Sequence, residues 1–209
     1  MPHILTSEMR RHFHETGALE VEDFFPKKIL TEIRQTVADP LPFIERYNKG
    51  HDLFRTQELF RRFDMRKDLV QFISELSQTH VLHLACDQLF DFRLTDGSGL
   101  LKSPSSFSDL FSLYPLLVAV LVCLEGEGES VKGQPFPSKV GNTTFFYPDM
   151  TVDWKHPTLQ GRSFFFLAYA PKGATVRFSP TDPHYAQLKR MDYQEGSPIE
   201  GRTHPLFRL

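Results

Sequence analysis

Cysteine, tryptophan and long apolar runs are scarce in this sequence. Only two cysteines occur in 209 residues, which is too few for a disulfide framework, and Cys86 and Cys123 both lie in apolar stretches typical of buried free thiols. The longest apolar stretch, 113–124, is well short of the roughly 20 residues that a membrane-spanning helix needs. No charged segment followed by an apolar one marks a secretory signal at the N-terminus. We therefore expect a cytoplasmic protein with no membrane partner.

A dominant charge is also lacking. The 24 Lys and Arg residues nearly balance the 26 Asp and Glu residues, and the formal net charge is -2 at pH 7. Nucleic-acid-binding domains usually carry a basic face. The one basic cluster, at 61–67, is interleaved with Asp64 and Asp68, as on a solvated helix face. The sequence therefore predicts no nucleic-acid partner.

Signatures of several enzyme classes are missing. The chain has no Gly-x-Ser-x-Gly elbow, no Walker motif and no Cys-x-x-Cys pair, which are the marks of α/β-hydrolases, P-loop proteins and thiol redox proteins. The Gly-rich segment 125–128 alternates Glu and Gly and leads into neither Gly-Lys-Ser/Thr nor a helix. It therefore does not predict a phosphate-binding loop.

Phenylalanine is abundant, with 20 Phe against 6 Tyr and 1 Trp. Several of these residues stand in runs, at 24–25, 145–146 and 164–166. Consecutive aromatic residues are typical of strands that are buried on both faces, as in a sandwich or a helix-covered barrel. The composition thus predicts a core built heavily from aromatic packing.

Helical patterns precede strand patterns along the chain. Helices are predicted at 7–15, 26–38 and 64–78, with Gly17 ending the first and Asp64 capping the third. Strands are predicted at 18–22, 80–85, 89–94, 116–123, 143–147, 162–170 and 175–179, and the strand at 116–123 is expected to be central because it is apolar on both faces. This order predicts a single α+β domain, 1–209, in which 1–80 is mainly helical and 81–209 is an antiparallel β-sandwich or barrel.

Three stretches follow an order that is found in a known enzyme family. Segment 13–26 passes from a helix through Gly and a short apolar strand to an acidic-aromatic step, and segment 64–94 combines an amphipathic helix with two strands. In segment 141–169, a Gly turn, a strand ending in aromatic residues and Pro, Arg162, and a strand ending at Tyr169 follow one another. Together these stretches resemble the phytanoyl-CoA hydroxylase type of Fe(II)/2-oxoglutarate oxygenase. The resemblance implies a double-stranded β-helix, the jelly-roll, cupin-like barrel of that superfamily, buttressed by the N-terminal helices.

The iron ligands implied by this resemblance are missing. Family members hold Fe(II) through His-x-Asp or His-x-Glu and a second His, but no His in this chain has an acidic residue two positions later. The family's order places the motif in 97–116, which lacks His, and the second His near Thr151 and Val152. The later basic position is filled by Arg162. The resemblance implies that Arg162 binds the far carboxylate of 2-oxoglutarate or another anion, and the competing interpretation is a strand-edge arginine.

Three hypotheses stay open. The first is a non-catalytic member of this fold that has lost iron, needs no cofactor and binds a small carboxylate or a protein partner, for example as a scaffold. The second is an active, divergent hydroxylase that uses Fe(II) and 2-oxoglutarate with a rearranged metal site of Asp153, His156 and His184. The third is a cupin-like small-molecule binder without oxygenase ancestry, expected if the helical buttress is absent. The missing motif favours the first hypothesis, and no catalytic residue is predicted.

Overall fold

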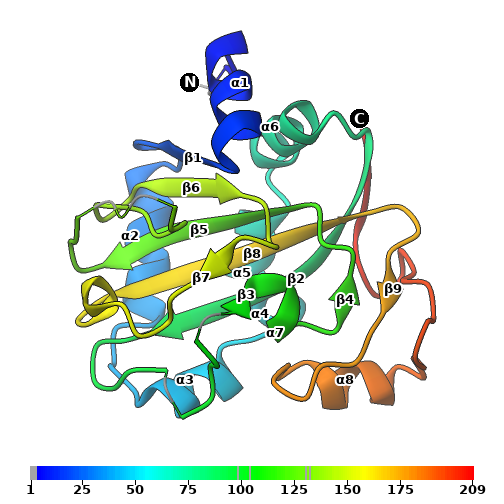
Figure 1. Ribbon diagram of the computed structural model, residues 1–209. Coiled ribbons are helices and arrows are strands. Elements are labelled where there is room, and N and C mark those ends of the chain that lie inside the picture. Colours follow the sequence, from blue (N-terminus) through cyan, green and yellow to red (C-terminus); the bar gives the residue numbers. More distant parts are fainter. Residues whose placement is uncertain (1–3, 98, 104, 130, 132) are drawn as a thin grey trace.

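A six-stranded antiparallel sheet dominates the computed structural model, which describes residues 4–97, 99–103, 105–129, 131 and 133–209 (Figure 1). The strand order is β1-β6-β5-β8-β2-β10. The strands are β1 (Ala18–Val21), β2 (Val81–Asp91), β5 (Val118–Glu125), β6 (Thr143–Phe146), β8 (Ser163–Pro171) and β10 (Leu206–Arg208). β5 lies between β6 and β8, so the prediction of a central strand there is confirmed.

The large sheet is buried on both faces, and alternate residues of each strand enter two different cores. In β8, Phe165 and Leu167 pack into the core on the helical side, whereas Phe164 and Phe166 pack into the core on the opposite side. This arrangement explains why the strands read as continuous apolar runs rather than as alternating patterns.

Helices cover one face of the sheet. In the view of Figure 1, α2 and α5 lie behind it, and residues of α1, α2, α5 and α6 share a core with the strands. The helices are α1 (Ser7–Thr16), α2 (Lys27–Thr36), α3 (Phe43–Lys49), α4 (Leu53–Thr56), α5 (Glu58–Asp64), α6 (Lys67–Ser77), α7 (Phe107–Leu110) and α8 (Tyr185–Arg190), with a 3₁₀ turn η1 (Pro157–Leu159). Gly17 ends α1 in the left-handed region, at φ 80°, as predicted.

Two short strand pairs lie apart from the large sheet. β3 (Ser105–Ser106) pairs with β7 (Thr151–Val152), and β4 (Leu113–Tyr114) pairs with β9 (Thr175–Val176). Figure 1 shows β3 and β7 in front of the large sheet. The predicted α+β fold with an antiparallel sheet is confirmed, and the strands of the described residues do not close into a hydrogen-bonded barrel.

Two local predictions are wrong. The region 80–94 holds one long strand, β2, instead of two, because the polar residues Asp87 and Gln88 that suggest a break are buried and form hydrogen bonds with α4 and α3. Asp64 does not cap a helix. It is the last residue of α5 and is fully buried, and α6 begins three residues later, at Lys67, without a side-chain cap.

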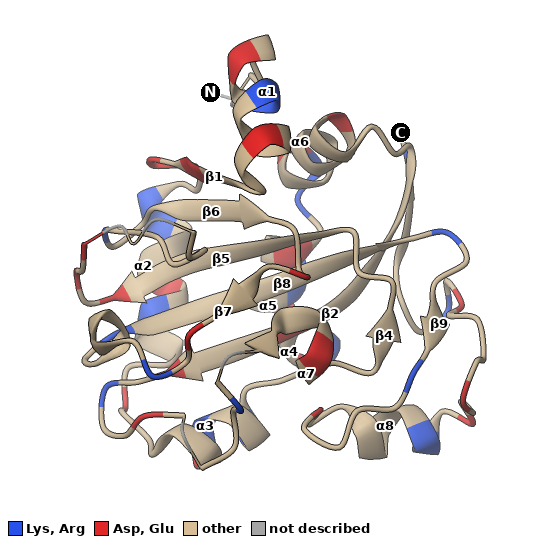
Figure 2. Cartoon of the chain, in the orientation of Figure 1, with Lys and Arg blue, Asp and Glu red and all other residues tan. Residues whose placement is uncertain are grey.

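The charged residues are spread over the molecule. In the view of Figure 2, acidic and basic segments alternate along helices and loops, and the central strands are largely uncharged. Within the part of the chain that the structure describes, no helix combines the length and apolarity needed to cross a membrane.

Candidate functional site

The two segments that the resemblance assigns to the iron ligands lie side by side. Ser105 of β3 pairs with Val152 of β7, and Ser106 pairs with Thr151. Segments that are far apart in the sequence thus meet at one place, in front of the large sheet (Figure 1). The two predicted ligand regions therefore meet at a single position in the fold. The side chains at this position can be compared with the two histidines and one carboxylate that bind iron in the family.

Aromatic rings fill this position. Phe107, the first residue of α7, stacks on Phe166 of β8 with ring centroids 4.8 Å apart and meets Trp154 edge-on at 4.8 Å. Both Phe107 and Trp154 are almost completely buried. We call the connected, buried set of rings the aromatic cluster; it consists of Phe90, Phe107, Phe111, Phe136, Phe146, Trp154, Phe164 and Phe166.

Several polar groups beside the aromatic cluster are hydrogen-bonded to other protein groups. The indole Nε1 of Trp154 donates to Ser105 Oγ at 2.9 Å. The carboxylate of Asp109 accepts from the backbone N and the Oγ of Ser106 in a capping box, and these hydrogen bonds lower the pKa of Asp109. No histidine of the described residues joins them, so the residues present do not fit an iron ion held by two histidines and a carboxylate.

Arg162 is buried beside the aromatic cluster, with 1% of its surface exposed. Its guanidinium donates to the carbonyl oxygens of Pro137 and Thr158 and lies 3.4 Å from Cys123 Sγ. It also stacks over the ring of Phe164, 4.7 Å from the centroid. Nε has no partner among the described residues. Anion binding by Arg162 stays a prediction, because protein groups surround most of its guanidinium.

The Gly-rich segment 125–128 closes over Arg162. A Cβ added to Gly126 would lie 2.7 Å from Arg162 Cγ and 2.7 Å from the Gly161 carbonyl oxygen, and one added to Gly128 would lie 2.9 Å from an Arg162 guanidinium nitrogen. Gly126 also has φ 78°, in the left-handed region. The glycines of this segment therefore allow the backbone to pack on a buried arginine.

The residues of the predicted rearranged metal site are distributed over two places. Asp153 accepts hydrogen bonds from Ser103 Oγ at 2.6 Å and from the Lys155 backbone. His156 caps the turn η1 through its own ring nitrogen. His184 instead belongs to a group with two residues that the sequence did not single out.

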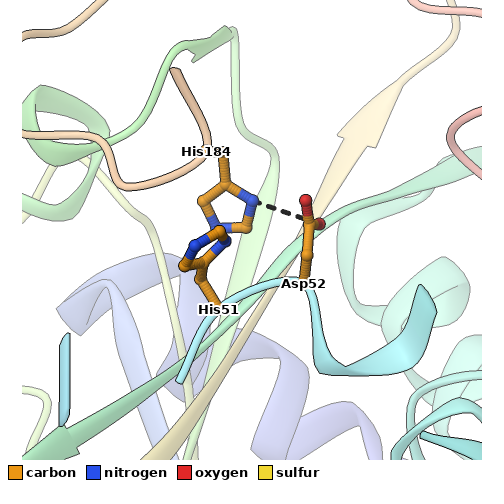
Figure 3. A group of neighbouring side chains, drawn as sticks. All are labelled: His51, Asp52 and His184. Carbon is orange, nitrogen blue, oxygen red and sulfur yellow. Dashed lines mark ion pairs between the residues drawn. The ribbon is translucent and has the colours of Figure 1, made fainter. Parts of the chain in front are cut away.

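His51, Asp52 and His184 form that group, which we call the histidine–aspartate trio (Figure 3). One potential ligand atom from each residue lies within 4.8 Å of the others. His51 and Asp52 connect α3 to α4, and His184 immediately precedes α8. Asp52 has φ 53°, a conformation that Asp tolerates better than most residues. Asp52 Oδ1 lies 3.1 Å from His184 Nδ1.

The charges in the trio are strongly coupled. Burial alone would lower the pKa of His184, but the charges of Asp52 and Asp182 raise it to about 9. Burial alone would raise the pKa of Asp52, yet His184 and Arg55 hold it well below its usual range. Burial and the nearby His184 lower the pKa of His51 to about 4. At neutral pH, without a bound ion, the trio is an Asp52–His184 ion pair beside a neutral His51.

A buried pair of carboxyl groups, Asp64 and Asp87, binds the segment that directly follows Asp52. Asp87 of β2 accepts from the backbone N of Leu53 at 2.8 Å and of Phe54 at 2.7 Å, which anchors α4 directly after Asp52. The carboxyl of Asp64 meets Asp87 and has no other donor. Burial raises the pKa of Asp64 well above its usual range and that of Asp87 to about 6. Asp64 therefore holds a proton that it donates to Asp87.

No protein-family model and no curated protein matches this sequence, but solved structures do. The non-heme alpha ketoglutarate dependent carbocyclase SnoK from nogalamycin biosynthesis is 14% identical, with a TM-score of 0.69 over 97% of this chain and 96% of that one. The chain has the fold of the non-heme Fe/2-oxoglutarate-dependent enzymes. The epimerase SnoN of the same biosynthesis is 14% identical, with a TM-score of 0.64 over 96% of this chain and 98% of that one. HygX from Streptomyces hygroscopicus, solved with nickel and 2-oxoglutarate, is 13% identical, with a TM-score of 0.56 over 81% and 88%.

No local sequence motif identifies the three residues of the histidine–aspartate trio. His51 and Asp52 are adjacent, so a search for His-x-Asp passes over them. His184 follows Asp182 and Pro183 in a polar segment, and nothing in the spacing connects it with residue 51. Only the sheet, which brings α3, α4 and α8 together at one edge, places the three side chains in one group (Figure 3).

Proposed function

We propose that this protein is a non-catalytic member of the Fe(II)/2-oxoglutarate oxygenase fold, with a binding or scaffolding role. The aromatic cluster carries the proposal. Rings occupy the position between the β3–β7 pair and the large sheet where the family's order places the iron ligands. Phe107, Val152 and Trp154 stand there in place of metal-binding side chains, and none of them can bind iron.

The contacts between the aromatic rings stabilise their packing at this position. Aromatic pairs contribute about 0.5–1.5 kcal/mol each beyond the burial of their surface, and Phe107 alone contacts the rings of Phe90, Phe146, Trp154 and Phe166. A cofactor could enter only if several buried rings moved. The enclosure of Arg162 by carbonyl oxygens and the Gly-rich segment supports the same conclusion for the carboxylate of 2-oxoglutarate.

The proposal includes finer assignments. We propose that the β3–β7 pair corresponds to the second sheet of a double-stranded β-helix. The order of the three stretches 13–26, 64–94 and 141–169 along the sequence supports the phytanoyl-CoA hydroxylase type. Two buried free cysteines support a reducing, cytoplasmic location. The balanced charge supports a protein partner rather than nucleic acid, and a small carboxylate stays the alternative ligand.

The two other hypotheses have less support. A cupin-like binder without oxygenase ancestry was expected to lack the helical buttress, but α2 and α6 pack in the core of the sheet. An active hydroxylase would need to bind Fe(II) and 2-oxoglutarate at the histidine–aspartate trio. The donor atoms of that group are the observation that favours this hypothesis.

Thermal unfolding with 2-oxoglutarate and Mn(II) or Fe(II), together with an assay for succinate, tests the proposed function. We expect no succinate and no shift in the melting temperature that depends on 2-oxoglutarate. A ligand at 100 times its Kd would stabilise the protein by roughly 2.7 kcal/mol, a readily measured shift. Arg162→Ala should respond like the wild type, and Arg177→Ala, at an exposed arginine, is the matched control.

Succinate formed by the wild type would show that the protein is catalytic, and the proposal would be wrong. A stabilisation by 2-oxoglutarate that disappears in Arg162→Ala but persists in Arg177→Ala, without succinate, would instead identify a carboxylate ligand of a non-catalytic protein.

A further inference from the structure

We propose that His51, Asp52 and His184 bind one divalent transition-metal ion of the zinc class, at a site beside the aromatic cluster, whose Phe111 meets the ring of His184 with centroids 5.9 Å apart. The inference goes beyond the proposed function, because none of the three residues belongs to β3, β7 or α7. It rests on the distances in the trio, on unpartnered ring nitrogens, on the surrounding charge and on a small adjoining cavity.

The spacing of the donor atoms is close to that of a metal site. Two ligand atoms at about 2.0–2.2 Å from a tetrahedral zinc ion lie roughly 3.3–3.6 Å apart. Asp52 Oδ1 and His184 Nδ1 are 3.1 Å apart, and all three donor atoms lie within 4.8 Å of one another. The ring of His51, which is partly exposed, must turn to bring the third donor to that distance.

Two buried ring nitrogens lack partners. Nε2 of His184 and Nδ1 of His51 have no hydrogen-bond partner among the described residues, and 5% of the surface of His184 is exposed. Figure 3 shows a ring nitrogen of His184 directed toward Asp52 and the other toward the ring of His51, with the two ring centroids 4.8 Å apart. Buried polar atoms without partners are costly. With His184 Nδ1 and Asp52 Oδ1 as the other two donors, an ion bound by Nδ1 of His51 would give that nitrogen a partner.

The neighbours fix the ligands in place. Asp182 accepts from the backbone N of His184 at 2.8 Å and from that of Ser112 at 2.7 Å, which holds the loop before α8. Arg55 Nε donates to Asp52 Oδ1 at 2.9 Å. Hydrogen bonds of this kind orient the ligands of metal sites before the metal binds.

The surrounding charge is suited to a cation. With His184 bound to the ion as a neutral imidazole, the buried carboxyl groups of Asp52, Asp87 and Asp182 face the guanidinium of Arg55. A divalent ion at the trio would balance this excess of acidic groups, whereas an anion would not.

The donor set identifies the class of ion. Two imidazoles and one carboxylate suit divalent zinc, cobalt, nickel or iron, whereas calcium and magnesium take oxygen ligands. A cavity of about 10 Å³ adjoins the trio, with Cys86, Phe111 and His204 in its wall. This is about the space of one water molecule, which would provide a fourth ligand.

Titration of the metal-free protein with Co(II), followed by its visible absorption, tests the proposal, with Zn(II) calorimetry as a second measurement. We expect one equivalent to bind. His51→Gln should weaken binding by at least about 100-fold, more than the loss of an outer hydrogen bond, and His156→Gln should bind like the wild type. Circular dichroism of the metal-free variants checks that they are folded.

A wild type that binds no stoichiometric ion would overturn the proposal, as would a His51→Gln variant that binds normally or a His156→Gln variant that does not. Protection of His51 from diethylpyrocarbonate by Zn(II), measured by mass spectrometry on the wild type, gives a test that does not depend on variant folding; unprotected His51 also contradicts the site. Succinate formation plays no part in these measurements, so they succeed or fail separately from the proposed function.

Discussion

In the aromatic cluster every ring packs against another ring, whereas two buried ring nitrogens of the histidine–aspartate trio have no hydrogen-bond partner in the described part of the chain. The cluster lies where relatives of this fold are expected to hold iron, and the trio lies at a position that the family's order does not mark. The same sheet supports both: β8 contributes Phe164 and Phe166 to the cluster, and β2 contributes Asp87 beneath the trio. The difference shows that one fold can fill one position with packed rings and place a group of metal-binding side chains at another.

The largest expected effect comes from emptying the aromatic cluster. Phe107→Ala removes a fully buried ring with four ring neighbours and should lower the free energy of unfolding by about 3–5 kcal/mol. Urea unfolding measures this loss, and Leu94→Ala, at a residue that is 56% exposed, should change stability by less than about 0.5 kcal/mol. A loss below about 1 kcal/mol for Phe107→Ala would mean that the rings only loosely occupy the position.

The carboxyl pair beneath the trio should give an intermediate, pH-dependent effect. The pKa values of Asp64 and Asp87 are raised by folding, so the folded protein holds more protons than the unfolded chain above about pH 4, and the stability from this pair falls as pH rises toward the folded pKa values. Asp64→Asn keeps a donor for Asp87 without a titrating proton. Relative to the wild type, this variant should gain stability, on the order of 2 kcal/mol, as the pH rises from 5 to 8.

Urea unfolding of both proteins at the two pH values measures this gain. The histidines, including those of the trio, are common to both proteins, so their contributions cancel in the difference. An equal stability difference at pH 5 and pH 8 would show that Asp64 and Asp87 do not share a proton.

The smallest expected effect concerns the segment that closes over Arg162. Gly126→Ala and Gly133→Ala both place Ala at a positive φ, 78° and 79°, but only the first adds a Cβ that collides with Arg162 and the Gly161 carbonyl. Both variants lose about 1 kcal/mol because Ala disfavours a positive φ. The collision of the added Cβ should make Gly126→Ala less stable than Gly133→Ala by a further 1–2 kcal/mol or so. Thermal unfolding of the two variants checks this difference. Equal losses would indicate that the Gly-rich segment does not enclose the arginine.

Sequence patterns predict the regular parts of this fold well. Continuous apolar runs give β5 and β8, and the Gly17 stop ends α1 at the expected place. The short helices α3, α4 and α5 were not predicted, because each has at most seven residues and depends on tertiary packing rather than on its own periodicity. The unbroken strand β2 was missed because Asp87 and Gln88 are polar but find buried partners.

The sites were harder to predict than the fold. The burial of Arg162 could not be deduced, because its partners are backbone carbonyl groups, which leave no trace in residue identity. The meaning of the glycines in 125–128 depended on the same contact. His184 was considered as a ligand with Asp153 and His156, but its neighbours come from the connection between α3 and α4, a region that had no predicted element.

The alternation of β8 between two cores also sets a rule for changes in chain length. Phe165 faces the helices and Phe164 and Phe166 face the aromatic cluster, so a single inserted residue within β8 would exchange the two sets along the rest of the strand. Both cores would then receive side chains selected for the other. Insertions or deletions in this strand are therefore expected to be tolerated only if they involve an even number of residues. The loop between β5 and β6 has no strand alternation and so does not have this restriction.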